Sequence, residues 1–246
     1  MAPPKTAVMA NAGSALIVEH LSVKQGEQLL VDDVTLDLRP LELHGVVGPR
    51  GAGKSLLLQA VAGLVPAGGD VMLGGVPLDR EHRRQHVFYL GDDVKHAFAG
   101  ERVLGVLAFA AQSLGSKKEL DDVIARLDCQ GLLDRRMGEL ARGERKRVTL
   151  AMALLVPRGF ILVDEPFAGL DYKEARAITN VLRTSTNENR SLLVTLHQLG
   201  DAERLCDRFT LLSAGRVVGA GQIHELRERA RTHPGAALEE VFLALC

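Results

Sequence analysis

An eight-residue stretch with the pattern G-x-x-x-x-G-K-[ST] constrains this chain more than any other feature, because the pattern predicts a loop that binds phosphate. Glycines within it let the backbone adopt conformations that a side chain would forbid. The backbone N–H groups can then point at phosphate oxygens, and the following helix adds the partial positive charge of its N-terminus. The stretch consists of Gly48, Pro49, Arg50, Gly51, Ala52, Gly53, Lys54 and Ser55.

The residues on either side supply the strand and the helix that this motif requires. Residues 41–47 form a short apolar segment typical of a strand, and residues 56–64 indicate a helix closed by glycine. We therefore expect the Lys54 ammonium to reach the β- and γ-phosphates of a nucleotide, and the Ser55 hydroxyl to ligate Mg²⁺. The predicted nucleotide contacts extend as far as Leu56.

A second candidate segment lies much further along the chain. Residues 160–163 are four apolar residues typical of a buried strand, and Asp164 and Glu165 follow at its C-terminal end. The ligand sites of parallel α/β sheets lie at that end of the strands. We expect Asp164 to hold the same Mg²⁺ as Ser55, and Glu165 to orient or deprotonate an attacking water.

Length and composition limit the remaining choices. The 246 residues suit one large α/β domain, and the formal net charge of -1 provides no overall field for nucleic acid or an anionic membrane. No apolar run approaches the roughly 18 residues that a membrane-spanning helix needs. The three cysteines are widely spaced, which argues against a disulfide framework or a zinc site and suits a reducing compartment.

Periodicity and composition divide the chain into regions. Residues 1–14 are rich in Ala and Pro and are expected to form a disordered tail, which leaves one folded domain over residues 15–246. Alternating apolar residues over residues 16–38 predict an antiparallel β layer above the P-loop core. A helical block is expected at about residues 94–155, and a helical C-terminal tail at about residues 222–246.

Two shorter segments are interpreted as connections. Residues 66–70 contain Pro and two glycines and predict a turn. Residues 80–86 carry five basic or histidine side chains and are interpreted as a solvated turn. His82 and His86 could share a helix face as metal ligands, but no further ligand accompanies them.

Together these motifs resemble the nucleotide-binding domain of an ATP-binding cassette (ABC) transporter, from residue 16 to about residue 221. Residues 168–171 match the D-loop of this family, with Ala168 where serine is usual, and residues 193–197 match its histidine switch. The resemblance implies an α/β fold with a RecA-like P-loop NTPase core, an antiparallel β layer and an inserted α-helical subdomain. It also implies ATP and Mg²⁺ as ligands.

The resemblance assigns roles to individual residues. It implies that Lys54, Glu165 and His197 are catalytic, with His197 sensing the γ-phosphate and positioning the water. It places Asp171 of the D-loop among the nucleotide-binding residues. In this family two such domains close head to tail, and each ATP lies between the P-loop of one domain and the signature loop of the other.

The signature loop of the family, normally Leu-Ser-Gly-Gly-Gln, is altered here. Ala141 lacks the hydroxyl of the usual serine, Arg142 replaces a glycine, and Gly143 is retained. The resemblance places all three residues at the nucleotide of the partner domain. Losing one positioned donor at a reacting centre can cost about 10²–10³ in rate, although Arg142 could compensate in part as a cation facing phosphate.

Two further positions depart from the family pattern. Gly91, followed by Asp92 and Asp93, stands where the family has a glutamine that contacts Mg²⁺ or water. Gln25 stands where an aromatic residue usually stacks on adenine. Base stacking typically contributes about 1–3 kcal/mol, so the sequence predicts weaker or less base-selective nucleotide binding.

The resemblance also narrows the biological role. Residues 144–148 are similar to the G subfamily, and residues 238–245 are similar to ATPase subunits of ABC-2-type exporters. We therefore expect a subunit that hydrolyses ATP and energises export through a separate membrane-spanning partner, peripheral on the cytoplasmic face of a membrane. A second nucleotide-binding domain, identical or different, is expected as a partner.

Two alternatives stay open. The altered positions also suit a regulatory half of an asymmetric pair that binds nucleotide with little hydrolysis of its own. A soluble ABC ATPase acting on DNA or ribosomes is disfavoured, because such proteins usually carry two nucleotide-binding domains or a long coiled-coil insertion, and because the chain is not basic. No nucleic-acid partner is expected.

Overall fold

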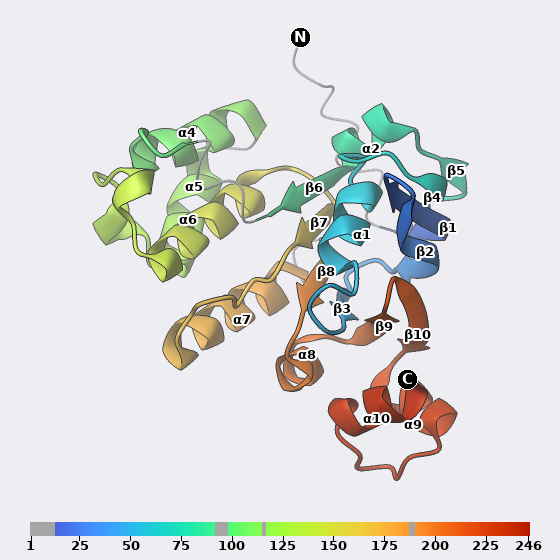
Figure 1. The fold of residues 1–246 in the computed structure, drawn as a ribbon. Coiled ribbons are helices and arrows are strands. Elements are labelled where there is room, and N and C mark those ends of the chain that lie inside the picture. Colours follow the sequence, from blue (N-terminus) through green and yellow to red (C-terminus); the bar gives the residue numbers. More distant parts are fainter. Residues whose placement is uncertain (1–12, 92–97, 115–116, 187–189) are drawn as a thin grey trace.

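The computed structural model describes residues 13–91, 98–114, 117–186 and 190–246 (Figure 1). Asp92 and Asp93, and all but the last two residues of the predicted disordered tail, lie outside the described residues. Two β-sheets, with helices around them, make up the described part of the chain.

The central sheet has the strand order β10-β9-β3-β8-β7-β6. Its neighbouring strands are parallel, except that β9 and β10 form an antiparallel pair. The strands β3, β7 and β8 are buried along their whole length, as expected of parallel strands covered on both faces. The bounds are β3 Leu43–Val47, β6 Val87–Leu90, β7 Phe160–Val163, β8 Ser191–Leu196, β9 Arg208–Ser213 and β10 Arg216–Gly221.

The second sheet is antiparallel and has the strand order β2-β1-β4-β5. Its inner face packs with helix α1 and with one face of the central sheet in a single hydrophobic core. The predicted antiparallel β layer is therefore confirmed, but β4 already begins at Gly68, inside the segment predicted as a turn. The bounds are β1 Leu16–Gln25, β2 Gln28–Leu38, α1 Lys54–Val61, β4 Gly68–Leu73 and β5 Val76–Pro77.

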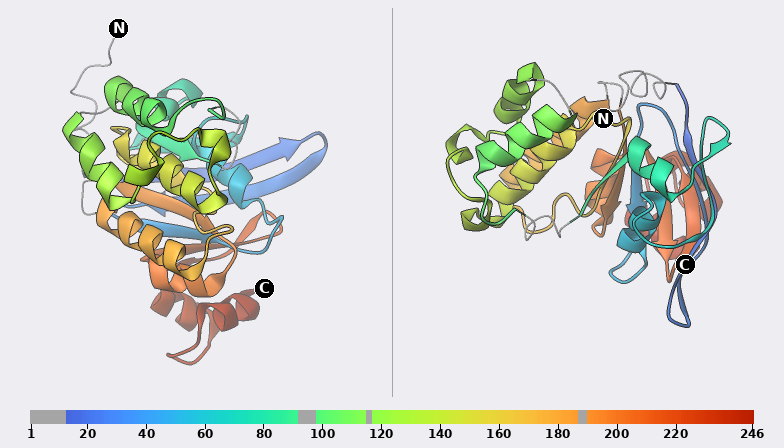
Figure 2. Two further views of the ribbon diagram at one scale, coloured as in Figure 1. Left: turned by 90° about the vertical axis from the view of Figure 1, so that its left-hand side faces the viewer. Right: turned by 90° about the horizontal axis from the view of Figure 1, so that it is seen from above.

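Helices cover the other face of the central sheet and form a second core with it. Figures 1 and 2 show α4, α5 and α6 gathered at one side of the molecule, away from the antiparallel sheet. Helix α6 begins at Arg142, because the Glu144 carboxylate accepts a hydrogen bond from the N–H of Ala141 at 2.8 Å and caps the first turn. The bounds are α4 Val103–Leu114, α5 Lys117–Arg126, α6 Arg142–Leu155, α7 Tyr172–Thr186 and α8 Leu199–Leu205.

The remaining short elements connect these layers or follow them. Two 3-10 turns lie between α5 and α6, and two helices follow β10, near the C-terminus in Figure 1. The residue limits proposed for a helical subdomain and for a C-terminal tail stay predictions. The bounds are η3 Gln130–Leu132, η4 Met137–Glu139, α9 Ile223–Ala230 and α10 Leu238–Leu245.

The basic cluster at residues 80–86 forms a helix, α2 (Arg80–His86), so the interpretation as a solvated turn was wrong. The Asp79 carboxylate caps its first turn, and Arg83 is buried. The guanidinium groups of Arg80, Arg83 and Arg84 donate hydrogen bonds to backbone carbonyls at the end of α1. Cations stabilise that end of a helix, which explains why the basic residues gather there.

The described part of the chain was also searched for membrane spans. None of its helices combines the length and the apolar character needed to cross a bilayer.

The structure predicts how two phenylalanine positions differ in their contribution to stability. Phe160 in β7 is 1% exposed, whereas Phe109 on α4 is 61% exposed. We expect Phe160→Ala to lower the free energy of unfolding by about 3–5 kcal/mol, because it opens a cavity in the core. The matched Phe109→Ala control should change it by about 0.5 kcal/mol or less. Guanidinium denaturation followed by circular dichroism measures both, and equal losses would contradict the core described above.

Candidate nucleotide-binding site

The predicted phosphate-binding loop connects β3 to α1 and packs tightly against its neighbours. A Cβ atom on Gly48 would lie 2.0 Å from the carbonyl oxygen of Leu212 in β9. At Gly53, φ is 95° and a Cβ would lie 2.8 Å from the carbonyl oxygen of Leu30 in β2. Glycine is therefore required at both positions, by close backbone contact and, at Gly53, also by a left-handed conformation.

The side chain of Lys54 folds back over this loop. Its Nζ donates hydrogen bonds to the carbonyl oxygens of Gly48 and Pro49, both at 2.8 Å. Burial lowers the pKa of Lys54, and the nearby carboxylates of Glu165 and Asp164 oppose this shift. The loop thus holds a buried cation beside backbone N–H groups, an arrangement suited to phosphate.

Asp164 follows the last residue of β7 and collects hydroxyl groups from three other elements. Its Oδ1 accepts hydrogen bonds from Ser55 Oγ of α1, at 3.0 Å, and from Thr195 Oγ1 of β8. Its Oδ2 accepts one from the Tyr89 hydroxyl of β6 at 3.3 Å. Hydroxyl and carboxylate oxygens are the ligands that Mg²⁺ prefers, so Ser55 and Asp164 fit a magnesium site.

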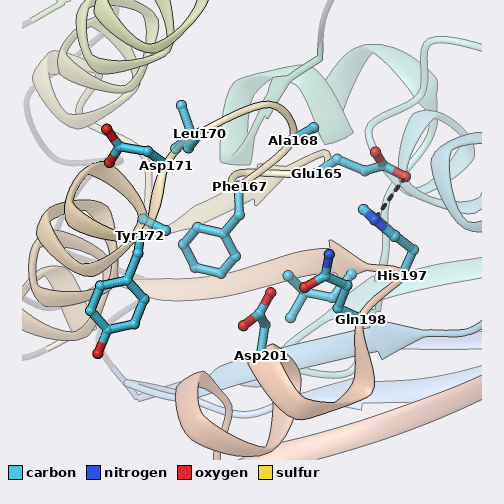
Figure 3. Close-up of a pocket in the computed structure, with 11 residues that line it drawn as sticks. Glu165, Phe167, Ala168, Leu170, Asp171, Tyr172, His197, Gln198 and Asp201 are labelled. Atoms are coloured by element: carbon cyan, nitrogen blue, oxygen red, sulfur yellow. Dashed lines mark ion pairs between the residues drawn. The ribbon is translucent and has the colours of Figure 1, made fainter.

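Glu165 has an unusual backbone conformation for a residue other than glycine. Its φ is 42°, and its N–H donates a hydrogen bond to Thr195 Oγ1 at 2.8 Å. Its Oε1 lies 3.7 Å from Nδ1 of His197, just beyond the end of β8 (Figure 3). Strained residues of this kind concentrate at functional sites.

The pair of Glu165 and His197 faces a cavity of about 190 Å³. Figure 3 shows the residues following β7 on one side of it and those following β8 on the other. The two side chains are 32% and 30% exposed, so water can reach them. The lining also includes Phe167, Ala168, Leu170, Asp171, Tyr172, Ala175, Leu196, Gln198 and Asp201.

The altered signature residues lie beside the D-loop and α7 of their own chain. A Cβ on Gly169 would lie 2.6 Å from Cδ and Nε of Arg142, so the exposed Arg142 side chain lies against this glycine. A Cβ on Gly143 would lie 2.0 Å from Oε1 of Glu174, a residue that exchanges hydrogen bonds with Asp171. Among the described residues, no hydrogen bond or ion pair joins residues 141–143 to the P-loop.

The structure therefore brings together Lys54, Ser55, Asp164, Glu165 and His197. Asp171 lines the same cavity as Glu165 and His197, whereas Ala141, Arg142 and Gly143 lie beside the D-loop and α7. Sequence reasoning missed Tyr89, Thr195 and Lys146, whose Nζ donates a hydrogen bond to the carbonyl oxygen of Asp164 at 3.2 Å. The sequence signal for two of them is a polar residue at a position where an apolar residue is expected. Thr195 interrupts an apolar strand, and Lys146 lies on the buried side of α6.

The position expected to contact adenine lies in the antiparallel sheet. Gln25 is the last residue of β1, in the β1–β2 hairpin that projects from the rest of the molecule in Figure 2. Its side chain is exposed. The weaker base stacking that we expect from its lack of an aromatic ring stays a prediction.

Comparison with known proteins gives a consistent result. The family model described as ABC transporter matches residues 31–168. The hemin import ATP-binding protein of Pseudomonas entomophila is 35% identical over 240 residues, which cover 92% of each chain. An ABC transporter ATP-binding protein of Pyrococcus furiosus is 31% identical over 222 residues, 86% of this chain and 81% of the relative.

A solved structure of the ATP-binding subunit of an ABC transporter is similar to this fold along nearly its whole length. Its TM-score is 0.82 at 26% identity, and the match covers 94% of this chain and 98% of that one. The α/β P-loop NTPase fold expected from the sequence is thereby confirmed. Family model, relatives and fold agree with the phosphate-binding loop and the carboxylates that face it: the chain belongs to the ABC transporter family, as an ATP-binding and ATP-hydrolysing component of such a transporter.

Proposed function

We propose that this chain energises export through a separate membrane-spanning partner, by hydrolysing ATP on the cytoplasmic face of a membrane. The observation that carries the hydrolytic part is the convergence of Ser55, Asp164, Glu165 and His197 beside the P-loop. Export is supported by residues 144–148 and by relatives named as Nod factor export ATP-binding proteins. The hemin import relative makes import the competing direction.

The proposed roles follow from the chemistry of each side chain. Lys54 would neutralise charge on the phosphates once its ammonium turns from the loop carbonyls to the nucleotide. Ser55 and Asp164 would hold Mg²⁺, which would supply positive charge to neutralise the phosphates. Glu165 would orient and deprotonate the attacking water. His197, whose Nδ1 lies 3.7 Å from Oε1 of Glu165, would hold that carboxylate in position relative to the γ-phosphate.

We further propose that the chain acts in a pair of nucleotide-binding domains, each completing the site of the other. The altered signature residues are at the surface, where Ala141 and Arg142 are exposed. Two copies of this chain would make two impaired sites. A partner with a serine and glycine in these positions would leave one site fully active, namely the one built on Lys54 and Glu165 of this chain.

The second candidate function is a regulatory half that binds ATP and hydrolyses little. The observation that favours it is the Arg142 side chain, which lies across Gly169 and would stand between the signature loop and a phosphate. The two candidates differ in one measurable property, the turnover that depends on Glu165.

We expect Glu165→Gln to lower the steady-state ATPase rate by about 10²–10⁴-fold, because an amide cannot accept the proton of the attacking water. ATP affinity should stay within about threefold of the original chain, since the P-loop is untouched. The matched control is Glu239→Gln, on the exposed first turn of α10, which should leave the rate unchanged. ATP binding without any turnover that depends on Glu165 would favour the regulatory candidate.

Restoring the signature tests the proposed pairing. We expect Ala141→Ser combined with Arg142→Gly to raise the ATPase rate of the purified chain by up to about 10²–10³-fold, because a donor and close backbone approach are regained. If hydrolysis requires two copies of the chain to associate, the ATPase rate should rise with the square of the protein concentration. Arg142→Lys is the control, since it keeps the bulk and the charge. An unchanged rate in the restored variant would show that the altered loop does not limit hydrolysis.

A further inference from the structure

The hydroxyl of Tyr89 contacts the carboxylate at the centre of the site. Its oxygen lies 3.3 Å from Oδ2 of Asp164, and Gln59 Nε2 of α1 donates a hydrogen bond to the same hydroxyl at 3.4 Å. The other carboxylate oxygen, Oδ1, is already engaged by Ser55 and Thr195. The Tyr89 hydroxyl therefore contacts the second oxygen of Asp164.

The order of the strands explains how Tyr89 reaches this carboxylate. In the sheet, β6 lies beside β7, Tyr89 is paired with Leu162, and the N–H of Asp164 donates to the carbonyl oxygen of Leu90 at 2.9 Å. Side chains alternate along a strand, so Tyr89 packs in the core that contains α1, whereas Leu90 packs in the opposite core. The ring thus lies on the P-loop face, next to the end of β7.

Gly91 gives an independent indication of the same arrangement. A Cβ on this residue would lie 2.7 Å from both Cε1 and the hydroxyl oxygen of Tyr89. The φ of Gly91 is outside the left-handed region, so its backbone does not require glycine. The Tyr89 ring occupies the space that a side chain at position 91 would need. The position of the ring therefore depends on glycine at position 91.

We propose that Tyr89 is a positioning residue for the magnesium-binding carboxylate, and that Gly91 is glycine in order to leave room for its ring. The proposal rests on the proposed role of Asp164 as a metal ligand. Thr195 from β8 and Tyr89 from β6 hold opposite oxygens of Asp164, from the strands on either side of β7. Ser55 is then able to turn to the metal while the carboxylate keeps its orientation.

Orientation matters here because Mg²⁺ demands nearly ideal octahedral geometry. Hydrogen bonds from the surrounding residues fix the direction of a ligating carboxylate, and their removal typically costs about 10–100-fold in metal affinity. The 3.3 Å distance is long for a hydrogen bond between a hydroxyl and a carboxylate. We therefore expect an effect at the lower end of that range.

The first test is Tyr89→Phe, which removes the hydroxyl and keeps the ring. Binding of a fluorescent ATP analogue is followed while Mg²⁺ is titrated, and again in EDTA. The Mg²⁺ concentration for half-maximal tight binding should rise about tenfold, with the affinity in EDTA unchanged. Thr184→Val removes a hydroxyl from the exposed side of α7 and should reproduce the original titration.

The second test asks whether positions 89 and 91 act as a unit. Gly91→Ala should displace the ring and raise the Mg²⁺ requirement as Tyr89→Phe does. In a Tyr89→Val background, where no ring is present, Gly91→Ala should add less than about twofold. A Tyr89→Phe titration identical to the original, or equal effects of Gly91→Ala in both backgrounds, overturns the proposal. If nucleotide binding by the original chain does not depend on Mg²⁺, Asp164 is not a metal ligand, and the proposed role of Tyr89 is contradicted as well.

Discussion

The hydrogen bond between Ser55 and Asp164 is the contact on which the site depends, because it joins two segments 109 residues apart in the sequence. Ser55 lies in the first turn of α1, which follows β3, and Asp164 follows β7, with β8 between these two strands in the sheet. Parallel strands end at the same edge, so the order β3-β8-β7 brings the P-loop, the carboxylates and His197 to one edge. The chemistry is thus a consequence of sheet topology.

Thr195 is the residue through which this edge is held together. Its hydroxyl donates to Asp164, and it accepts from the N–H of Glu165, whose left-handed backbone costs on the order of 1–3 kcal/mol. The N–H of Ala168 donates to the carbonyl oxygen of Glu165 and completes the turn. Because Thr195 is fully buried in β8, the core fixes the position of the hydroxyl, and the hydroxyl in turn holds the Asp164 carboxylate and the backbone N–H of Glu165.

The sequence predicted this fold well wherever one pattern decided the outcome. The strand at residues 160–163 has the predicted bounds, because a continuous apolar run leaves little choice. Helices α2 and α8 were missed, since α2 depends on a cap and on carbonyls at the end of α1, and α8 is short. Motif spacing located Lys54, Ser55, Asp164, Glu165 and His197, whose roles stay predictions. Tyr89 and Lys146 could not be located in this way, because their contacts depend on which strands and helices become neighbours.

Two departures from the family pattern, at residues 91 and 142, have different physical consequences. Gly91 is buried and follows β6, and the space beside it is filled by the ring of Tyr89, whose hydroxyl contacts Asp164. Arg142 is exposed and lies against Gly169 on a surface apart from the P-loop. Among the described residues, no hydrogen bond or ion pair joins Arg142 to the P-loop. The first departure is thus an internal rearrangement, whereas the second would act, in the proposed pair, at the nucleotide of the domain that packs against this surface.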